Sequence, residues 1–350
     1  MLLASLSACG TSSSPSGDFS GGQSASGIGT GVNELPAGYN MLTGLPGPEG
    51  LLEGQRPAAV IVSNDIYSLP QRGLASADVL YEMVTEGGIT RLMAMYADYR
   101  SLPLVGPVRS IRDQQVQLAV PINAILVHVG SSPYARNLLN VLEYQNIDGI
   151  YLGSTAFVFD EALAQTRRNE YCYFTNAELM WRGMERLDVL TTGVVPPLFS
   201  FGEARQGTDA AERIDVTFSP ASYCSFEYNA RQGLYLKNIF DAPHADEDGS
   251  RLAFTNVIIL STAIGLKVDQ YCTDFDFSGG TGVYFVNGAA QEITWVKGSP
   301  ESPLLLFDKS GNMLQVQPGK SYIGVIADDG TASVTYSAGG VPPDDSSLSA

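Results

Sequence analysis

The stretch 124-AILVHVGSSPYARNLLNVLEY-144 changes from an apolar run, broken only by a histidine, to an amphipathic pattern across one short loop. Residues 124–129 predict a buried strand, and residues 133–144 predict a helix that opens after Gly130-Ser131-Ser132. A strand followed at once by a helix is the unit of sheets that are covered by helices. This stretch therefore favours an α/β arrangement.

The same alternation extends on both sides of this stretch. Strands are expected at residues 58–62, 91–96 and 150–152, and helices at residues 77–86, capped by Ser76, and at 113–119 and 176–187. Such alternation is typical of a mainly parallel sheet with helices on its faces. We therefore expect an N-terminal α/β domain over residues 33–190.

Helical periodicity disappears after residue 187. Residues 191–197, TTGVVPP, form a break. Short strands with turn signals between them follow, at residues 223–228, 233–237, 256–260, 282–285, 292–297, 304–307, 313–317 and 322–326. These predict a β-rich domain over residues 191–336, either a sandwich or a curled sheet, followed by a disordered tail over 337–350. The expected class is α+β overall.

Composition excludes several classes of partner. The chain has 37 Asp plus Glu against 20 Lys plus Arg, a net charge of -17, so its surface repels nucleic-acid phosphates. Two histidines and four cysteines are too few, and wrongly spaced, for a zinc or iron–sulfur site. No nucleic acid, metal or cofactor is expected.

The first nine residues, 1-MLLASLSAC-9, end in a lipobox, Leu6-Ser7-Ala8-Cys9. We expect a signal over residues 1–9 and acylation of Cys9 by palmitate-type chains, which would hold the protein outside the cytoplasm on the outer face of a bacterial membrane. The apolar run is short and lacks a charged start, as in a truncated signal. The alternative is a buried strand with an incidental cysteine. Residues 10–32, mostly Gly, Ser and Thr, predict a flexible tether.

An oxidising location changes how the other cysteines are interpreted. Disulfides persist outside the cytosol, and Cys224 and Cys272 both lie in strand-like segments, so they are the candidate pair. Cys172 is then an odd thiol, interpreted as a small buried apolar residue in preference to a nucleophile.

Several motifs, in order, resemble the YerB-like lipoprotein family. They are 42-LTGL-45, 56-RPAAVIVSN-64, 77-ADVLYE-82, 86-EGGITRLMA-94, 106-GPVRSIR-112, 128-HVGSSP-133, 243-PHAD-246, 256-NVII-259, 288-GAAQEITWVK-297 and 318-PGKSYI-323. The resemblance implies a lipid-anchored protein with an N-terminal α/β domain and a C-terminal β domain, in a family whose biochemical activity is uncharacterised. Residues 168–176, RNEYCYFTN, depart from the family pattern by losing a histidine.

The loop 106-GPVRSIRD-113 is the first candidate site. It brings Arg109, Ser110 and Arg112 to the start of an expected helix, an arrangement that binds carboxylates or phosphates. Arg91 follows a second loop, Glu86-Gly87-Gly88, which lacks the pattern of a phosphate-binding loop. The alternative is that the arginines pair internally, with carboxylates at Glu82, Glu86 or Asp78.

A second candidate lies at the end of the strand quoted first. His128 is a potential general base, with Ser131 or Ser132 as hydroxyl donor or nucleophile, because ligands gather at the carboxyl ends of strands in open α/β sheets. No nucleophile elbow is present, and a lone strand histidine is commonly a core residue. We expect Arg109, Arg112 and His128 to converge.

Two features of the second half give weaker signals. His244 lies in an acidic turn, 243-PHADEDG-249, interpreted as a solvated loop in preference to a calcium site. The aromatic residues Tyr284, Phe285, Trp295 and Tyr322 suit either a sugar-stacking face or the sheet core.

The leading hypothesis is an accessory lipoprotein that binds an anionic small molecule or cell-wall ligand through its α/β domain. One alternative is a wall-associated hydrolase or transferase that uses His128 with Ser131 or Ser132. The other is a structural module that binds a protein partner through exposed strand edges.

Overall fold

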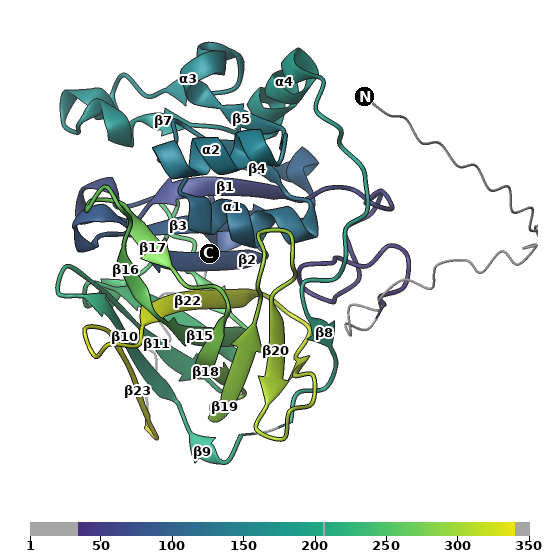
Figure 1. The fold of residues 1–350 in the computed structure, drawn as a ribbon, viewed down its shortest axis with the longest axis vertical. Helices are drawn as coiled ribbons and strands as arrows, with labels where there is room; N and C mark the ends of the chain where they lie inside the picture. Colours follow the sequence, from purple (N-terminus) through teal and green to yellow (C-terminus); the bar gives the residue numbers. More distant parts are fainter. Residues whose placement is uncertain (1–33, 206, 340–350) are drawn as a thin grey trace, which may run out of the picture. The chain divides into compact units, whose positions relative to one another are not determined.

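The computed structural model describes residues 34–205 and 207–339 (Figure 1). The expected signal, Cys9, the whole of the tether and residues 340–350 of the expected tail lie outside the described residues. The helices are α1 (Asp113–Ala119), α2 (Pro133–Val141), α3 (Gly149–Leu152) and α4 (Ala177–Leu187). The largest sheet runs, in spatial order, through β20 (Leu305–Asp308), β19 (Ala289–Val296), β18 (Gly279–Val286), β15 (Asn256–Thr262), β22 (Ser321–Ala327), β2 (Val79–Val84), β3 (Thr90–Tyr96), β1 (Ala58–Ser63), β4 (Ile125–His128) and β5 (Asn146–Asp148), with β9 (Asp209–Ala210) beside β19.

This sheet is mixed. The pairs β1/β4, β4/β5, β2/β22 and β15/β22 are parallel, and β3 is antiparallel to both β1 and β2. Six strands, β15, β22, β2, β1, β4 and β5, therefore end at one edge, which we call the carboxyl edge. The predicted class is confirmed, with parallel strands beside helices in the first half and mostly antiparallel strands in the second.

Each face of the sheet has its own core. On one face, α1 and α2 cover the alternate residues of β1–β4 that include Ile61 and Met93 (Figure 1). On the other face, α4 packs against the first half and a second sheet packs against the rest. The second sheet contains β13 (Ala242–Pro243), β12 (Leu234–Ile239), β11 (Ser222–Asn229), β10 (Arg213–Ser219) and β23 (Ser333–Ser337), with β14 (Ala253–Phe254) beside β12.

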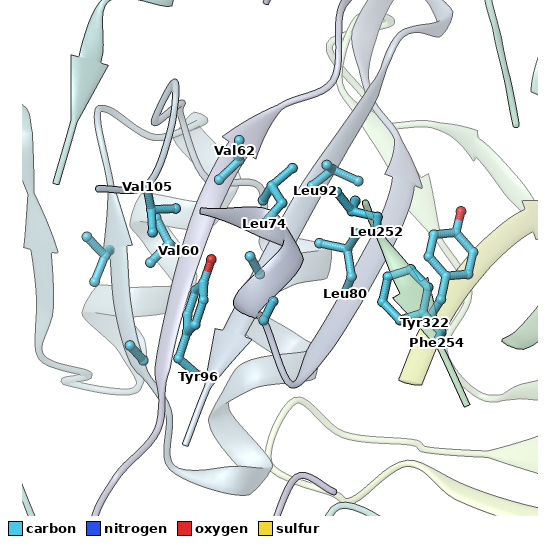
Figure 2. Close-up of a cluster of buried hydrophobic side chains, with 14 of the residues drawn as sticks. Val60, Val62, Leu74, Leu80, Leu92, Tyr96, Val105, Leu252, Phe254 and Tyr322 are labelled. Carbon is cyan, nitrogen blue, oxygen red and sulfur yellow. The ribbon is translucent and has the colours of Figure 1, made fainter. Parts of the chain in front are cut away.

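Figure 2 shows the core of the second face, where Leu80 from β2 lies near Leu252, Phe254 and Tyr322. Three short pairs complete the strands that the structure describes: β16 (Ile264–Leu266) with β17 (Thr273–Phe275), β8 (Ser200–Phe201) with β21 (Gln315–Val316), and β6 (Val158–Phe159) with β7 (Tyr173–Phe174).

Most predicted elements are present, and two are wrong. The helix expected at residues 77–86 is strand β2, because this segment lies between β3 and β22 and is buried on both faces. Its proposed cap, Ser76, belongs to a short 3-10 turn, Leu74–Ser76. The strand expected at 150–152 is α3, and the strand β5 precedes it. Strands β10 and β23 were not predicted.

The predicted disulfide is also wrong. Cys224 and Cys272 are both free thiols: Cys224 lies in β11 of the second sheet, whereas Cys272 lies in the bend just before β17. Cys224 Sγ is 3.6 Å from the Tyr322 hydroxyl, and burial raises its pKa to about 12. Cys172 is buried, as predicted.

The two halves of the sequence share one sheet, through the β2/β22 pair. The division of the chain at residue 191 stays a prediction. In the part of the chain that the structure describes, no helix is long and apolar enough to span a bilayer.

Candidate anion-binding site

The arginine loop is built into the carboxyl edge. Residues 107–112 run between the ends of β1 and β4, where Arg109 N donates to Ile61 O (2.8 Å) and Val129 N donates to Arg109 O (3.1 Å). The approach to this segment needs a glycine, because a Cβ on Gly106 would lie 2.7 Å from the Phe174 ring, at a φ of +154°. The backbone of Arg109 is therefore fixed by two strands.

Arg112 is neutralised by Glu86 in the turn between β2 and β3. Its Nε and Nη2 donate to the two carboxylate oxygens at 2.7 and 2.6 Å, and both side chains are largely buried. Burial favours the neutral acid, but the hydrogen bonds and charge of Arg112 outweigh it and lower the pKa of Glu86. The internal pairing considered for the arginines is thus present here.

Arg91, at the start of β3, is buried without such a partner. Its side chain reaches the arginine loop, where Nη1 donates to Ser110 O (3.0 Å), and the residue is 3% exposed. No carboxylate among the described residues forms an ion pair with it. Burial, together with the charges of Arg112 and Arg109, lowers the pKa of Arg91 to about 9, so the group is still charged at neutral pH.

Arg109 is only loosely compensated. Its Nη1 donates to the carbonyl of Glu170 (3.1 Å), whereas the half-exposed Glu170 carboxylate is 3.8 Å away. The guanidinium lies 5.3 Å from the centre of the Tyr171 ring. Its Nε is buried and has no acceptor among the described residues. We call Arg91, Arg109 and Arg112 the arginine cluster; it has more positive than negative charge, in a chain of net charge -17.

His128 does not join this cluster. It is buried, Nδ1 donates to Gly130 O (2.9 Å) and Nε2 lies 3.1 Å from Oδ1 of Asn146. Burial lowers its pKa against the opposing charge of Asp148, which keeps the ring neutral. The expected convergence is therefore wrong for His128, which is the core histidine of the alternative interpretation.

The three serines near the cluster differ in role. Ser132 caps α2, because its Oγ accepts from Ala135 N (3.0 Å). Ser110 Oγ donates to Val129 O (3.0 Å), and Ser131 forms a backbone bridge with Ile111. Ser132 is thus occupied as a helix cap and is not free as a nucleophile.

Glu82 lies on the opposite face of the sheet from Arg91. Its carboxylate accepts from Asn64, Thr90 and Tyr322, each at 2.8 Å, and from Lys237 at 3.3 Å. All these side chains are buried. Glu82 therefore belongs to the interface between the two sheets and not to the arginine cluster.

His244 itself is buried, whereas residues 247–249 of the same turn are exposed, so the interpretation as a solvated loop is wrong for the histidine. Lys237 Nζ donates to His244 Nδ1 (3.2 Å), and His244 Nε2 donates to Gln71 Oε1 (3.0 Å). Burial and the charges of Lys237 and Arg251 lower the pKa of His244 well below its ordinary value. The aromatic residues considered for a sugar-stacking face are buried as well: Tyr284, Phe285, Trp295 and Tyr322.

Several other cations in the described residues also lack a carboxylate partner: Arg56 and Lys297 are buried and donate to backbone carbonyls, and Arg251 donates to Asn238 while its Nε has no acceptor. Arg72, in a groove of about 290 Å³, pairs with Asp160 (3.0 Å) and Glu247 (2.7 Å). No group of three His, Cys, Asp or Glu side chains suited to a metal ion occurs among the described residues. The arginine cluster differs from these places because it brings three guanidiniums together at the carboxyl edge, where Glu86 is the carboxylate that forms a close bidentate pair.

The sequence interpretation missed the exposed side chains beside this cluster. Tyr67 is 72% exposed in the loop that follows β1, and Tyr151 is 81% exposed in α3, which follows β5. A repeated pattern, Asp-Ile-Tyr at 65–67 and Asp-Gly-Ile-Tyr at 148–151, was the available signal.

Known proteins have the same fold and a similar sequence. The chain is 28% identical over 304 residues to "Putative lipoprotein YerB" of Bacillus subtilis (strain 168), which covers 85% of this chain and 89% of that protein. The crystal structure of the YerB protein from Bacillus subtilis superposes with a TM-score of 0.74 at 26% identity, over 86% of this chain and all of the other. Residues 42–189 and 214–323 match the N-terminal and C-terminal domains of a family described as "Protein of unknown function (DUF3048)". The chain therefore belongs to the DUF3048 family.

Proposed function

We propose that this protein is a lipid-anchored extracytoplasmic protein that binds an anionic ligand at the carboxyl edge, through Arg91 and Arg109 with Arg112 beside them. The name of its Bacillus relative and the lipobox at Cys9 support the lipid anchor and the location on the outer face of the membrane. The ligand supplies a carboxylate or a phosphate, which a guanidinium binds in a bidentate manner.

The observation that carries this proposal is a buried cation without an ion pair of its own: the Glu86 carboxylate, whose charge acts on Arg91, is held by Arg112. Removing a guanidinium from water is costly unless an anion or a full set of acceptors replaces the water. Arg91 has a single carbonyl acceptor among the described residues, and Arg109 Nε has none. An anion between the two would satisfy both.

The test is isothermal titration calorimetry, in which inorganic phosphate or pyrophosphate is titrated into the full chain carrying Cys9→Ser. We expect binding to wild type, about tenfold weaker binding to Arg109→Gln, and a larger loss in Arg91→Gln/Arg109→Gln. Arg205→Gln is the matched control, because Arg205 is exposed and lies 4.0 Å from Asp308. Urea unfolding of each variant reports whether it is folded.

Absence of binding to wild type would refute the proposal. So would unchanged affinity in a folded Arg109→Gln variant.

A further inference from the structure

Exposed apolar side chains gather beyond the carboxyl edge on three connections, which we call the three loops. One follows β1, one follows β5 and contains the short helix α3, and the third is the β16–β17 hairpin, which follows β15. Each of these apolar residues is at least half exposed, and Val268 is 93% exposed. We call this set the apolar rim: Ile66, Tyr67, Ile150, Tyr151, Leu266, Val268 and Tyr271.

An aspartate fixes each of the three loops. Its carboxylate accepts a backbone N–H two residues further along, which rigidifies the turn and presents the side chains there to solvent. The three hydrogen bonds join Asp65 to Tyr67 N (2.8 Å), Asp148 to Ile150 N (2.9 Å) and Asp269 to Tyr271 N (3.0 Å). Holding large apolar groups in water in this way has no stabilising role in the folded chain.

Short contacts connect the apolar rim to the arginine cluster. Ser63 N, at the end of β1, donates to Pro107 O (2.9 Å), just before Arg109. Lys267, in the β16–β17 turn, pairs with Asp113 (3.0 Å), the residue after Arg112.

The loop after β5 also lies close to the loop that carries the arginine cluster. A Cβ on Gly130 would stand 3.7 Å from Ile150 and 3.2 Å from Ser110 Oγ. The cluster thus lies among the three loops.

The extent of the apolar rim excludes a small molecule as its only occupant. Strands β15 and β5 are six positions apart in the sheet, which at ~4.8 Å per strand corresponds to about 29 Å. Aliphatic side chains beside tyrosines are typical of loops that enter the headgroup region of a bilayer, where tyrosine places its ring in the apolar part and its hydroxyl in the polar part. A guanidinium binds a lipid phosphate as it binds other phosphates.

We propose that the carboxyl edge docks on a phospholipid membrane, with the apolar rim in the headgroup region and a lipid phosphate in the arginine cluster. This inference rests on the proposed function, since the phosphate is the anion that the cluster binds. The chain as a whole has a net charge of -17 and is repelled by anionic lipids, so the attraction to a lipid phosphate comes from the guanidiniums of the arginine cluster. The tether and anchor proposed above would keep this edge within reach of the bilayer.

The test is co-sedimentation of the full chain carrying Cys9→Ser with vesicles of phosphatidylcholine and phosphatidylglycerol, so that no anchor contributes. We expect wild type to sediment with the vesicles. The rim variant Tyr67→Ser/Tyr151→Ser/Val268→Ser should lose about tenfold or more in vesicle affinity while it binds inorganic phosphate as wild type does.

The matched control is Trp181→Ser/Leu190→Ser/Val194→Ser. These residues are also exposed, Val194 at 85%, but lie away from the carboxyl edge. Their replacement should leave vesicle affinity unchanged.

The outcomes separate the two proposals. Phosphate binding without vesicle binding overturns membrane docking, leaves the proposed function standing and assigns the rim to a protein partner. Vesicle binding that survives in the rim variant also overturns membrane docking. Failure to bind free phosphate overturns the proposed function itself.

Discussion

At the residue scale, Ser132 separates a structural role from a catalytic one. Its Oγ accepts from Ala135 N at the start of α2, so Ser132→Ala should lower the free energy of unfolding by about 1 kcal/mol. Ser131→Ala is the control, because the Ser131 hydroxyl forms no hydrogen bond among the described residues, and its effect should stay within about 0.5 kcal/mol. Urea unfolding followed by tryptophan fluorescence measures both. Equal effects would contradict the cap assignment.

The two histidines predict a loss of stability in mild acid. Both pKa values are lowered in the folded chain, so below pH ~6.5 the unfolded chain takes up protons that the folded chain does not. Stability is thus highest above the unfolded pKa and falls with decreasing pH, by about 1.4 kcal/mol per pH unit for each histidine until its folded pKa is reached.

Urea unfolding at several pH values between neutrality and pH ~5 tests this slope. His128→Gln and His244→Gln should each reduce it, whatever their effect at pH ~7. An unchanged slope in both variants would show that the histidines titrate normally.

At the element scale, the contact of β2 with the second sheet includes one buried ion pair. Lys237 Nζ lies 3.3 Å from Glu82, and both side chains are fully buried. Removing either partner leaves a buried charge, so Glu82→Gln and Lys237→Met should each cost about 3–5 kcal/mol. The double variant should cost clearly less than the sum.

Thermal and urea unfolding of the four proteins give this coupling directly. The control is Lys309→Met, because its pair with Glu292 at 2.9 Å is exposed and should leave stability nearly unchanged. Additive effects of the two buried substitutions would show that Glu82 and Lys237 do not act as a pair.

At the scale of the whole molecule, the two halves should not fold separately. Strand β2 pairs with β22 from the second half, so a fragment of residues 34–190 exposes a long apolar edge. We expect this fragment to aggregate, and co-expression with residues 191–339 to recover a soluble complex, as judged by gel filtration and circular dichroism. A monomeric fragment 34–190 that unfolds cooperatively would contradict this expectation and support two independent domains.

Local patterns were enough for much of the fold. An apolar run bounded by turns predicts strands such as β1 and β4, and 3.6-residue periodicity predicts α1, α2 and α4. The pattern failed for β2, because a strand buried on both faces has no alternation to distinguish it from a helix. Part of the candidate site could also be predicted from local sequence, because Arg109 and Arg112 lie close together in one loop.

By itself, the sequence determined the strand and helix alternation, the acidic surface, the lipobox and the family. These depend on neighbouring residues or on composition. Only the tertiary structure decided which charges are paired. Arg112 meets Glu86, whereas Arg91 meets no carboxylate among the described residues, and Glu82 turns to the other face towards Lys237. Those partners are brought together by strand register across the mixed sheet, and register is set by long-range pairing that no local pattern encodes.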